Sequence, residues 1–414
     1  MDRNQATGLI LFAAVILIYS IFFASGPELP PVETTVETEA VNSASTESTI
    51  ETVALPDSLI DAKRAEKYGV FAALTVGEEE HITLENDDVK ITLSTKGGQI
   101  SQVELKQYKS WKNEPLYLLD EQSSSMSFEL ASRLGPLNLA DLYFKPTFSE
   151  ESGENGTVKV LTLTATSDYG KITQIYRLAE GSYLVSKSLD LGNFQNQLSG
   201  KEIQFSWNDQ IKAQEKDLAE SRRKTELTYF TTTETKDNLG VGNDPEESSV
   251  SEPVKWIGFS QRFFTAGIIA DSAFQNVKLA QSTPEDSSVV RVMNTQFSIP
   301  MENGKASLSY YFGPDQYKTL KQITPGFEKN VDMGYFFVSW VNKYIVVHLF
   351  EFLEKYFNSY GIIIILIVLI IKLALSPLTY KSYIGMAKMR VIKPEIDELK
   401  EKYGDDPTKM QQEQ

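Results

Sequence analysis

Residues 361–378, GIIIILIVLIIKLALSPL, form an almost wholly apolar stretch that holds one charged residue, Lys372. As an α-helix rising 1.5 Å per residue, this stretch spans roughly 27 Å, close to the hydrocarbon thickness of a bilayer. We therefore predict a transmembrane helix over residues 360–378. Ionisable residues inside such helices usually face a protein interior or a water-filled cavity, which makes Lys372 the candidate functional residue. The alternative is that Lys372 only extends to the membrane surface, since Pro377 and Lys381 follow closely.

The residues after this helix are basic. Lys381, Lys388, Arg390 and Lys393 precede the first acidic residue, Glu395. By the positive-inside rule this flank marks the cytoplasmic side. We predict that residues 379–414 begin a cytoplasmic helical hairpin and basic flank. The second arm has room for only about two turns, and so short a helix is marginal alone, so we expect the chain to be the N-terminal part of a longer product.

Residues 333–357, MGYFFVSWVNKYIVVHLFEFLEKYF, precede the transmembrane stretch. Apolar residues recur at steps of three and four, and aromatic residues are frequent. This pattern predicts an amphipathic helix in the membrane interface. A second membrane span and a core helix of the preceding domain are the alternatives.

The N-terminal region has two parts. Residues 6–25 are apolar enough to span a membrane, and Arg3 lies before them. The length of the apolar run favours an uncleaved anchor over a signal peptide, with residues 1–5 in the cytoplasm. Residues 26–61 are rich in Thr, Glu, Ser, Val and Pro and hold no Lys or Arg, which predicts an acidic, disordered linker outside the membrane.

Residues 62–325 have the pattern of β-structure. Val89, Ile91 and Leu93 alternate with polar residues, as in a half-buried strand. Gly, Asn, Asp and Pro separate the further runs at 158–164, 172–178, 183–189, 202–207, 256–269, 289–297 and 306–312. Many short strands of this kind predict a large antiparallel sandwich, with a short charged helix or excursion at 214–224.

Composition narrows the function classes. The 414 residues carry a net charge of −16, which argues against nucleic-acid recognition. The absence of cysteine excludes disulfides, thiol nucleophiles and cysteine–zinc sites. Only two histidines, His81 and His348, are available for histidine-dependent catalysis, and neither has a supporting motif. We therefore predict no catalytic residue, no metal site and no cofactor.

Four segments resemble the YidC family of bacterial membrane-protein insertases. The segment SPLTYKSYIGMAKMRVIKPEIDELKEKYGDD at 376–406 is similar to the family's junction between its first core membrane helix and its cytoplasmic hairpin. Residues 84–111, 255–271 and 310–320 resemble strands of its periplasmic domain. The N-terminal MDRN before an apolar span also fits.

This resemblance implies a multi-domain membrane protein with a periplasmic all-β supersandwich, galactose-mutarotase-like, joined to transmembrane and interfacial α-helices. It implies a non-covalent insertase and chaperone of the bacterial inner membrane. The partners implied are nascent inner-membrane proteins, the Sec translocon, the ribosome and the lipid bilayer. The family has a hydrophilic groove with a positive residue, usually arginine, and Lys372 occupies that position. The family's three remaining core helices are not in this chain, so we expect a fragment or a truncated reading frame that does not insert substrates alone.

Two other functions fit parts of the pattern. A membrane-tethered carbohydrate-binding protein would suit the mutarotase-like domain, although that chemistry usually needs histidine. An adaptor protein with two spans would use the β-domain as a docking surface. Further apolar spans encoded downstream would favour the insertase.

Overall fold

The computed structural model describes residues 57–153 and 156–403, so the predicted anchor at 6–25 and most of the linker lie outside the described residues. The described residues divide into two compact units, with the boundary between Asp332 and Met333. Each unit is described by itself below.

The β unit begins with helix α2 (Asp57–Tyr68) and the 3-10 helix η1 (Gly69–Thr75). The linker predicted over 26–61 is therefore wrong for its last five residues, which are helical. Asp61 and Arg64 form an i,i+3 ion pair of 2.6 Å on α2, and most of its residues favour helix. The buried side chains of Phe71 and Leu74 fix η1 to the rest of the unit, with the Phe71 ring stacked on Phe194.

A four-stranded antiparallel sheet forms one layer of the β unit, in the order β1-β2-β3-β4. Its strands are β1 (His81–Glu85), β2 (Val89–Ser94), β3 (Gln99–Lys109) and β4 (Pro115–Leu119). Val89, Ile91 and Leu93 are fully buried, as their alternation predicted.

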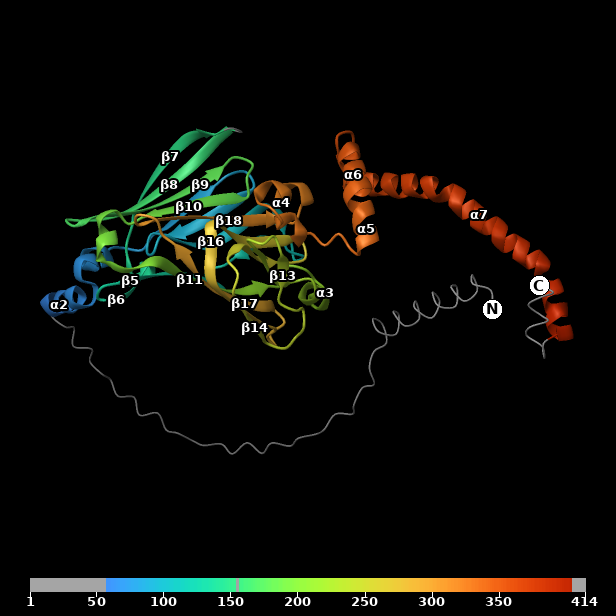
Figure 1. The fold of residues 1–414 in the computed structure, drawn as a ribbon. Helices are drawn as coiled ribbons and strands as arrows, with labels where there is room; N and C mark the ends of the chain where they lie inside the picture. The colour runs from blue at the N-terminus through green and yellow to red at the C-terminus, as the bar shows by residue number, and fades with distance from the viewer. Residues whose placement is uncertain (1–56, 154–155, 404–414) are drawn as a thin grey trace, which may run out of the picture. The chain divides into compact units, whose positions relative to one another are not determined.

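The second layer is a 14-stranded sheet whose main path runs β6-β5-β11-β17-β16-β18-β10-β9-β8-β7, with β12 to β15 attached beside it (Figure 1). The strands on the path are β5 (Ser124–Ser132), β6 (Gly135–Asn138), β7 (Lys145–Gly153), β8 (Gly156–Ser167), β9 (Gly170–Ala179), β10 (Leu184–Asp190), β11 (Leu198–Lys212), β16 (Phe264–Ser282), β17 (Val289–Pro300) and β18 (Lys305–Pro314). The attached strands are β12 (Glu226–Thr231), β13 (Lys236–Asn238), β14 (Glu246–Val250) and β15 (Val254–Ser260). The antiparallel all-β sandwich predicted from the sequence is confirmed.

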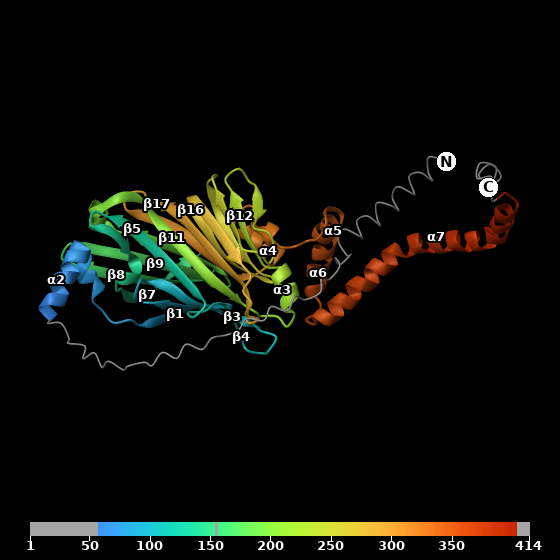
Figure 2. The same ribbon diagram turned by 90° about the horizontal axis from the view of Figure 1, so that it is seen from below.

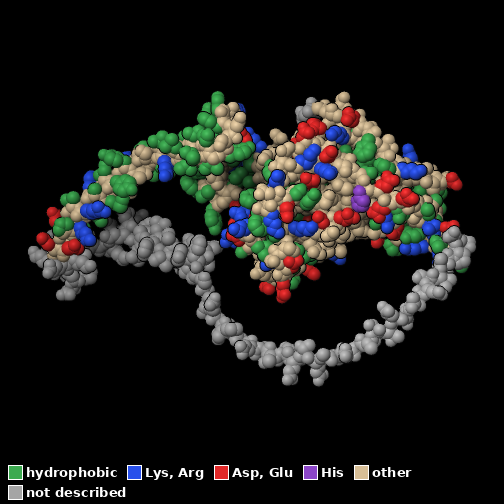
Figure 3. Space-filling view, turned by 180° about the vertical axis from the view of Figure 1, so that it is seen from behind, with side chains coloured by type: hydrophobic (Ala, Val, Ile, Leu, Met, Phe, Trp, Pro, Cys, Tyr) green, Lys and Arg blue, Asp and Glu red, His purple; other side chains and the backbone are tan. Residues whose placement is uncertain are grey.

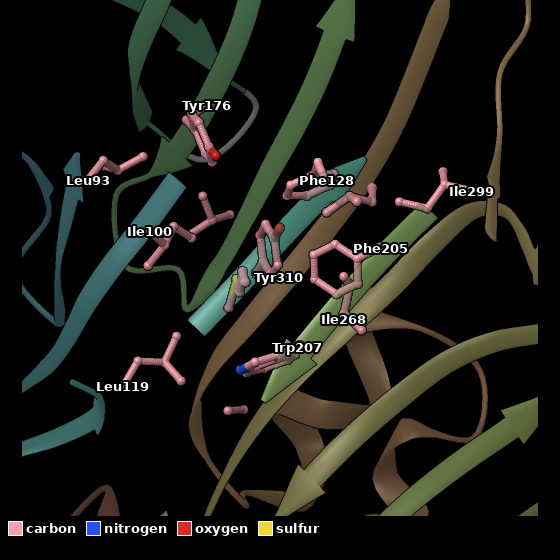
Figure 4. Close-up of a cluster of buried hydrophobic side chains, with 14 of the residues drawn as sticks. Leu93, Ile100, Leu119, Phe128, Tyr176, Phe205, Trp207, Ile268, Ile299 and Tyr310 are labelled. Carbon is pink, nitrogen blue, oxygen red and sulfur yellow. The ribbon is translucent and has the colours of Figure 1, made fainter. Parts of the chain in front are cut away.

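The core lies between the two sheets. Figure 4 shows Leu93, Ile100 and Leu119 of the small sheet facing Tyr176, Phe205, Trp207 and Tyr310 of the large one. Short helical segments complete the unit: η2 (Leu139–Asp141), η3 (Gly192–Gln197), α3 (Leu218–Arg223), α4 (Tyr317–Ile323) and η4 (Phe327–Asn330). The predicted charged helix at 214–224 corresponds to α3.

Two predicted boundaries in this unit need correction. The run 256–269, expected as one strand, is split between β15 and β16, because the chain turns at 261–263, where Gln261 N–H donates to Phe264 O. The β-domain, expected to end at 325, continues to Asp332, because η4 packs on the sheet. The Phe327 ring contacts Trp256 edge-on, at a centroid distance of 5.0 Å.

The second unit is helical in its described residues. It contains α5 (Phe336–Val341), the π-helical turn η5 (Asn342–Val346), α6 (Val347–Glu354) and the long helix α7 (Tyr360–Tyr403). The sequence was divided at 378/379 into a transmembrane helix and a hairpin arm, but the structure has one continuous helix through Pro377 and Pro394. Figure 2 shows α7 bent rather than straight, as expected where proline removes a backbone hydrogen bond.

Candidate functional site

Within the described residues, two helical segments are long and apolar enough to cross a membrane: residues 336–354 and residues 360–398. Figure 3 shows hydrophobic side chains gathered over α5, α6 and α7. Many of these apolar side chains are exposed in the isolated chain, including Phe336, Trp340, Tyr344, Ile365 and Leu373. A large exposed apolar surface of this kind is typical of contact with lipid or with other membrane helices.

Lys372 lies on α7 with its side chain exposed. Ser376, Thr379 and Tyr383 follow it by four, seven and eleven residues, so at 3.6 residues per turn all four share one narrow face of the helix. The Thr379 hydroxyl donates to the Leu375 carbonyl at 3.0 Å. The lysine therefore begins a polar stripe that leads out of the apolar part of α7.

Helix α6 covers a different face of α7. Ile363 and Ile367 are buried against Leu353 of α6, and Ile371 packs at the rim of this cluster. By helical geometry Ile363 and Ile367 lie roughly opposite Lys372. The face that carries the lysine is therefore left open by α6.

Pro377 adds a polar group near this stripe. Because proline has no N–H, the carbonyl of Leu373 loses its helical hydrogen-bond donor. A free backbone carbonyl inside a membrane needs another partner, such as water or a hydroxyl group. The neighbourhood of Lys372 can therefore hold water at a depth where α7 is otherwise apolar.

The structure does not gather the basic flank on one face. Lys381, Lys388, Arg390 and Lys393 all lie on α7 and are exposed. Helical spacing places Lys381 and Lys388 on the face of α7 opposite Lys372, whereas Arg390 lies on the same face as Lys372. The flank thus supplies positive charge around the helix rather than a directed site. Within the described residues none of the four forms an ion pair.

Sequence reasoning missed the buried Lys187 and Asp209 and the half-buried Asp315 of the β unit. Burial lowers the pKa of Lys187 well below its ordinary value. Burial also raises the pKa of Asp209 to about 8, and that of Asp315 to about 7. The alternation of Val185, Lys187 and Leu189 was a usable signal, because it places the lysine on the inner face of β10.

These groups do not form an acid–base pair. Charges near Asp209 come from Lys212 and Asp120, whereas Asp315 accepts a 2.7 Å hydrogen bond from Thr265 and lies near Lys236. In the part of the chain that the structure describes, no cluster of three His, Asp or Glu residues is placed to hold a metal ion. His81 is exposed on β1, 3.9 Å from Glu121, and His348 lies on α6.

Comparison with known proteins gives a consistent result. The family model described as YidC periplasmic domain matches residues 81–348, and the model described as 60Kd inner membrane protein matches residues 352–414. The chain is 35% identical to the membrane protein insertase YidC of Amoebophilus asiaticus, over 100% of this chain and 69% of that protein. It is 33% identical to that of Cytophaga hutchinsonii, over 100% of this chain and 68% of that protein.

Solved structures that match part of this chain include YidC of Thermotoga maritima, with a TM-score of 0.35 and 12% identity over 78% of this chain and 79% of that chain. A galactose mutarotase related enzyme of Lactobacillus acidophilus has a TM-score of 0.34 and 9% identity over 56% of this chain and 97% of that chain. The sequence relatives favour the insertase over the carbohydrate-binding and adaptor alternatives.

Proposed function

Since this chain belongs to the YidC family of membrane protein insertases, we propose that the protein inserts proteins into the bacterial inner membrane and helps them to fold there. The observation that carries this proposal is the 35% identity to a named insertase along the whole chain. The polar stripe on α7 supports it, because an insertase must offer polar groups to a substrate inside the bilayer.

Lys372 is the proposed groove cation. A polar tail that crosses hydrocarbon loses its hydration, and a wet cavity part of the way across shortens the dry distance. A fixed positive charge in that cavity offsets part of the desolvation cost of an acidic tail, because charges interact more strongly at low dielectric. Electrostatic attraction makes and breaks no covalent bond, so the proposed role of Lys372 is non-covalent.

The remaining parts of the proposal concern topology and partners. The basic residues after Lys372 favour a cytoplasmic end for α7, which places the β unit in the periplasm. The helical segment 336–354 would lie in the interface, with Trp340 and Tyr344 at headgroup level. The Sec translocon and the ribosome are the proposed protein partners, which would deliver nascent chains to this site.

Insertion of a single-span protein with an acidic N-terminal tail tests the role of Lys372. The assay uses cells that are depleted of their own insertase and supplied with the complete gene that encodes this chain. It scores the translocated tail by protease accessibility. We expect Lys372→Ala to reduce insertion severalfold and Lys372→Arg to retain it, because only the charge is required. Lys381→Ala is the matched control, since it removes a positive charge from the opposite face of α7. Full insertion by Lys372→Ala would favour a lysine that only reaches the membrane surface.

A further inference from the structure

Two edge strands of the β unit border a common groove. β1 ends the four-stranded sheet, and β7 ends the 14-stranded sheet. The groove between them has a volume of about 410 Å³ and is lined by Thr83, Leu84 and Glu85 of β1, by Phe148, Ser149 and Glu150 of β7, and by Lys159 of β8. Figure 2 shows β1 and β7 as neighbours. The groove is therefore the open rim of the sandwich.

The hydrogen-bond register of β1 leaves backbone groups pointing into this rim. Asn86 N–H donates to Val89 O, and Thr95 N–H donates to Glu80 O, so even-numbered residues of β1 pair with β2. In an antiparallel ladder the intervening residues direct their N–H and C=O groups outward. His81, Thr83 and Glu85 are these residues. The Glu85 carbonyl accepts from Lys159 Nζ at 2.9 Å, and in the described residues the amide groups of Thr83 have no partner.

Phe148 is an exposed apolar residue on the core face of β7, beside the free edge of β1. Phe148 pairs with Leu161, which pairs with Tyr176, so all three lie on the core face of the large sheet. Leu161 and Tyr176 are buried, but Phe148 is 55% exposed. A strand added to the outer edge of β1 would lie roughly 4.8 Å further along and would cover Phe148.

Charge limits what such a strand can be. Glu78 and Glu80 precede β1, and within the described residues neither forms an ion pair. Glu150 lines the groove opposite Lys159 in the β7–β8 register, and the two do not form an ion pair. Glu85 is already paired with Lys106 at 3.3 Å. The chain's own linker at 26–56 is acidic and has no Lys or Arg, so it is a poor occupant of this rim. Lys or Arg would complement it.

We propose that the free edge of β1 binds an extended segment of a partner protein by strand addition, and that this segment has apolar residues at alternate positions and basic residues near its ends. Main-chain hydrogen bonds to Thr83 supply affinity, and an apolar side chain on Phe148 supplies specificity. The partner is not the insertion substrate, whose tail the proposed function takes to be acidic.

Fluorescence anisotropy with the full chain in nanodiscs tests this inference. The probe is a fluorescent peptide as long as β7, in which Val and Thr alternate and Lys occupies both ends. A second peptide has Glu in place of Lys. A third keeps the Lys side chains but carries N-methyl groups on alternate residues. We expect only the first to bind, because the second opposes the charge of the rim and the third cannot pair with β1.

Substitutions in the chain locate the binding edge. Thr83→Pro removes an outward N–H and no bond to β2, and proline is tolerated on edge strands. We expect it to weaken binding at least about tenfold, the factor that corresponds to about 1.4 kcal/mol. Thr83→Val keeps the N–H and is expected to bind normally. Phe148→Ser changes an exposed side chain, preserves the fold and is also expected to weaken binding.

Three outcomes would overturn the proposal. Equal binding of the Glu and Lys peptides would show that the partner segment need not be basic. Normal binding by Phe148→Ser would show that the segment does not lie in the groove. If sedimentation shows a dimer, and Thr83→Pro converts it to a monomer, then the free edge of β1 pairs with a second copy of the chain. The insertion assay with Lys372 variants is independent of all three, so failure here leaves the proposed function standing.

Discussion

The side-chain nitrogen of Lys187 lies 3.8 Å from the centre of the Phe128 ring, inside the sandwich core. The Tyr176 ring is 5.1 Å away on β9, and Lys187 is only 3% exposed. Within the described residues this nitrogen has no hydrogen-bond partner. A cation there would gain a contact with the aromatic faces but would lose its hydration, and burial lowers the pKa of Lys187 accordingly.

We expect Lys187→Met to stabilise the β unit at neutral pH. Between the lowered pKa and the ordinary value near 10.5, the unfolded chain binds a proton that the folded chain does not, so the free energy of unfolding rises with pH across this window. Methionine has no ionisable group, so it removes the free-energy cost of burying the lysine amine. The expected gain at neutral pH is at least about 1 kcal/mol, since one pKa unit corresponds to about 1.4 kcal/mol. Urea unfolding followed by tryptophan fluorescence measures it. Lys171→Met, on the exposed side of the adjacent strand, is the control, and a loss of stability in Lys187→Met would contradict the account.

Asp209 is expected to act in the opposite direction. Burial raises its pKa from 3.8 to about 8, so the folded chain holds a proton that the unfolded chain releases between these values. The contribution of the protonated Asp209 to the free energy of unfolding is complete below about pH 4 and is lost as the pH rises to about 8. We expect Asp209→Asn to leave stability at pH 4 nearly unchanged and to raise it at pH 8 by an amount on the order of a few kcal/mol. Parallel unfolding curves for the two chains across this range would argue against a neutral Asp209.

The register of β15 and β16 brings two glycines together, Gly258 opposite Gly267. A Cβ on Gly267 would lie 2.8 Å from Cζ of Phe327, so the ring of η4 occupies the space that a side chain would need. We expect Gly267→Val to destabilise the β unit by about 1–3 kcal/mol through overpacking. Thermal unfolding measures this cost. Gly242→Val, where a Cβ would meet nothing within 4 Å, is the matched control.

A double-mutant cycle separates this contact from a general effect of valine. Phe327→Ala empties the space over Gly267, so the added valine should cost less in that background than in the unchanged chain. Equal costs in both backgrounds would show that Phe327 is not the obstacle.

Period-2 patterns located about half of the described strands, because burial on one face leaves a direct trace in the sequence, as in Val89, Ile91 and Leu93. The sheet order could not be obtained in this way. β11, for example, lies between β5 and β17, and pairings so distant in sequence depend on tertiary packing. Helix α2 was missed because its first five residues, 57–61, hold no Lys or Arg and so continue the composition of the linker. The buried Phe71 and Leu74 in the following turn show that this segment packs on the sandwich.

The candidate site was partly accessible from the sequence. Lys372 is conspicuous because a charge interrupts an apolar run, and its spacing to Ser376 and Thr379 is already present in the printed residues. The sequence did not show which face of α7 is covered by α6, because this depends on the packing of Leu353 against Ile363 and Ile367. Nor did the sequence directly indicate that α7 continues through Pro377, since proline usually marks a helix boundary.

The absence of cysteine from the chain permits a clean test of topology, because each introduced thiol is the only one present. Ser152 on β7 is exposed, and Met389 on α7 is 62% exposed. We expect Ser152→Cys to react with a membrane-impermeant maleimide in intact spheroplasts, and Met389→Cys to react only after permeabilisation. The number of crossings between the two positions decides the result. One crossing, by α7, places them on opposite sides, whereas a second crossing by residues 336–354 would return them to the same side. Labelling of both thiols from outside, or of neither, would therefore replace the interfacial helix with a second membrane span.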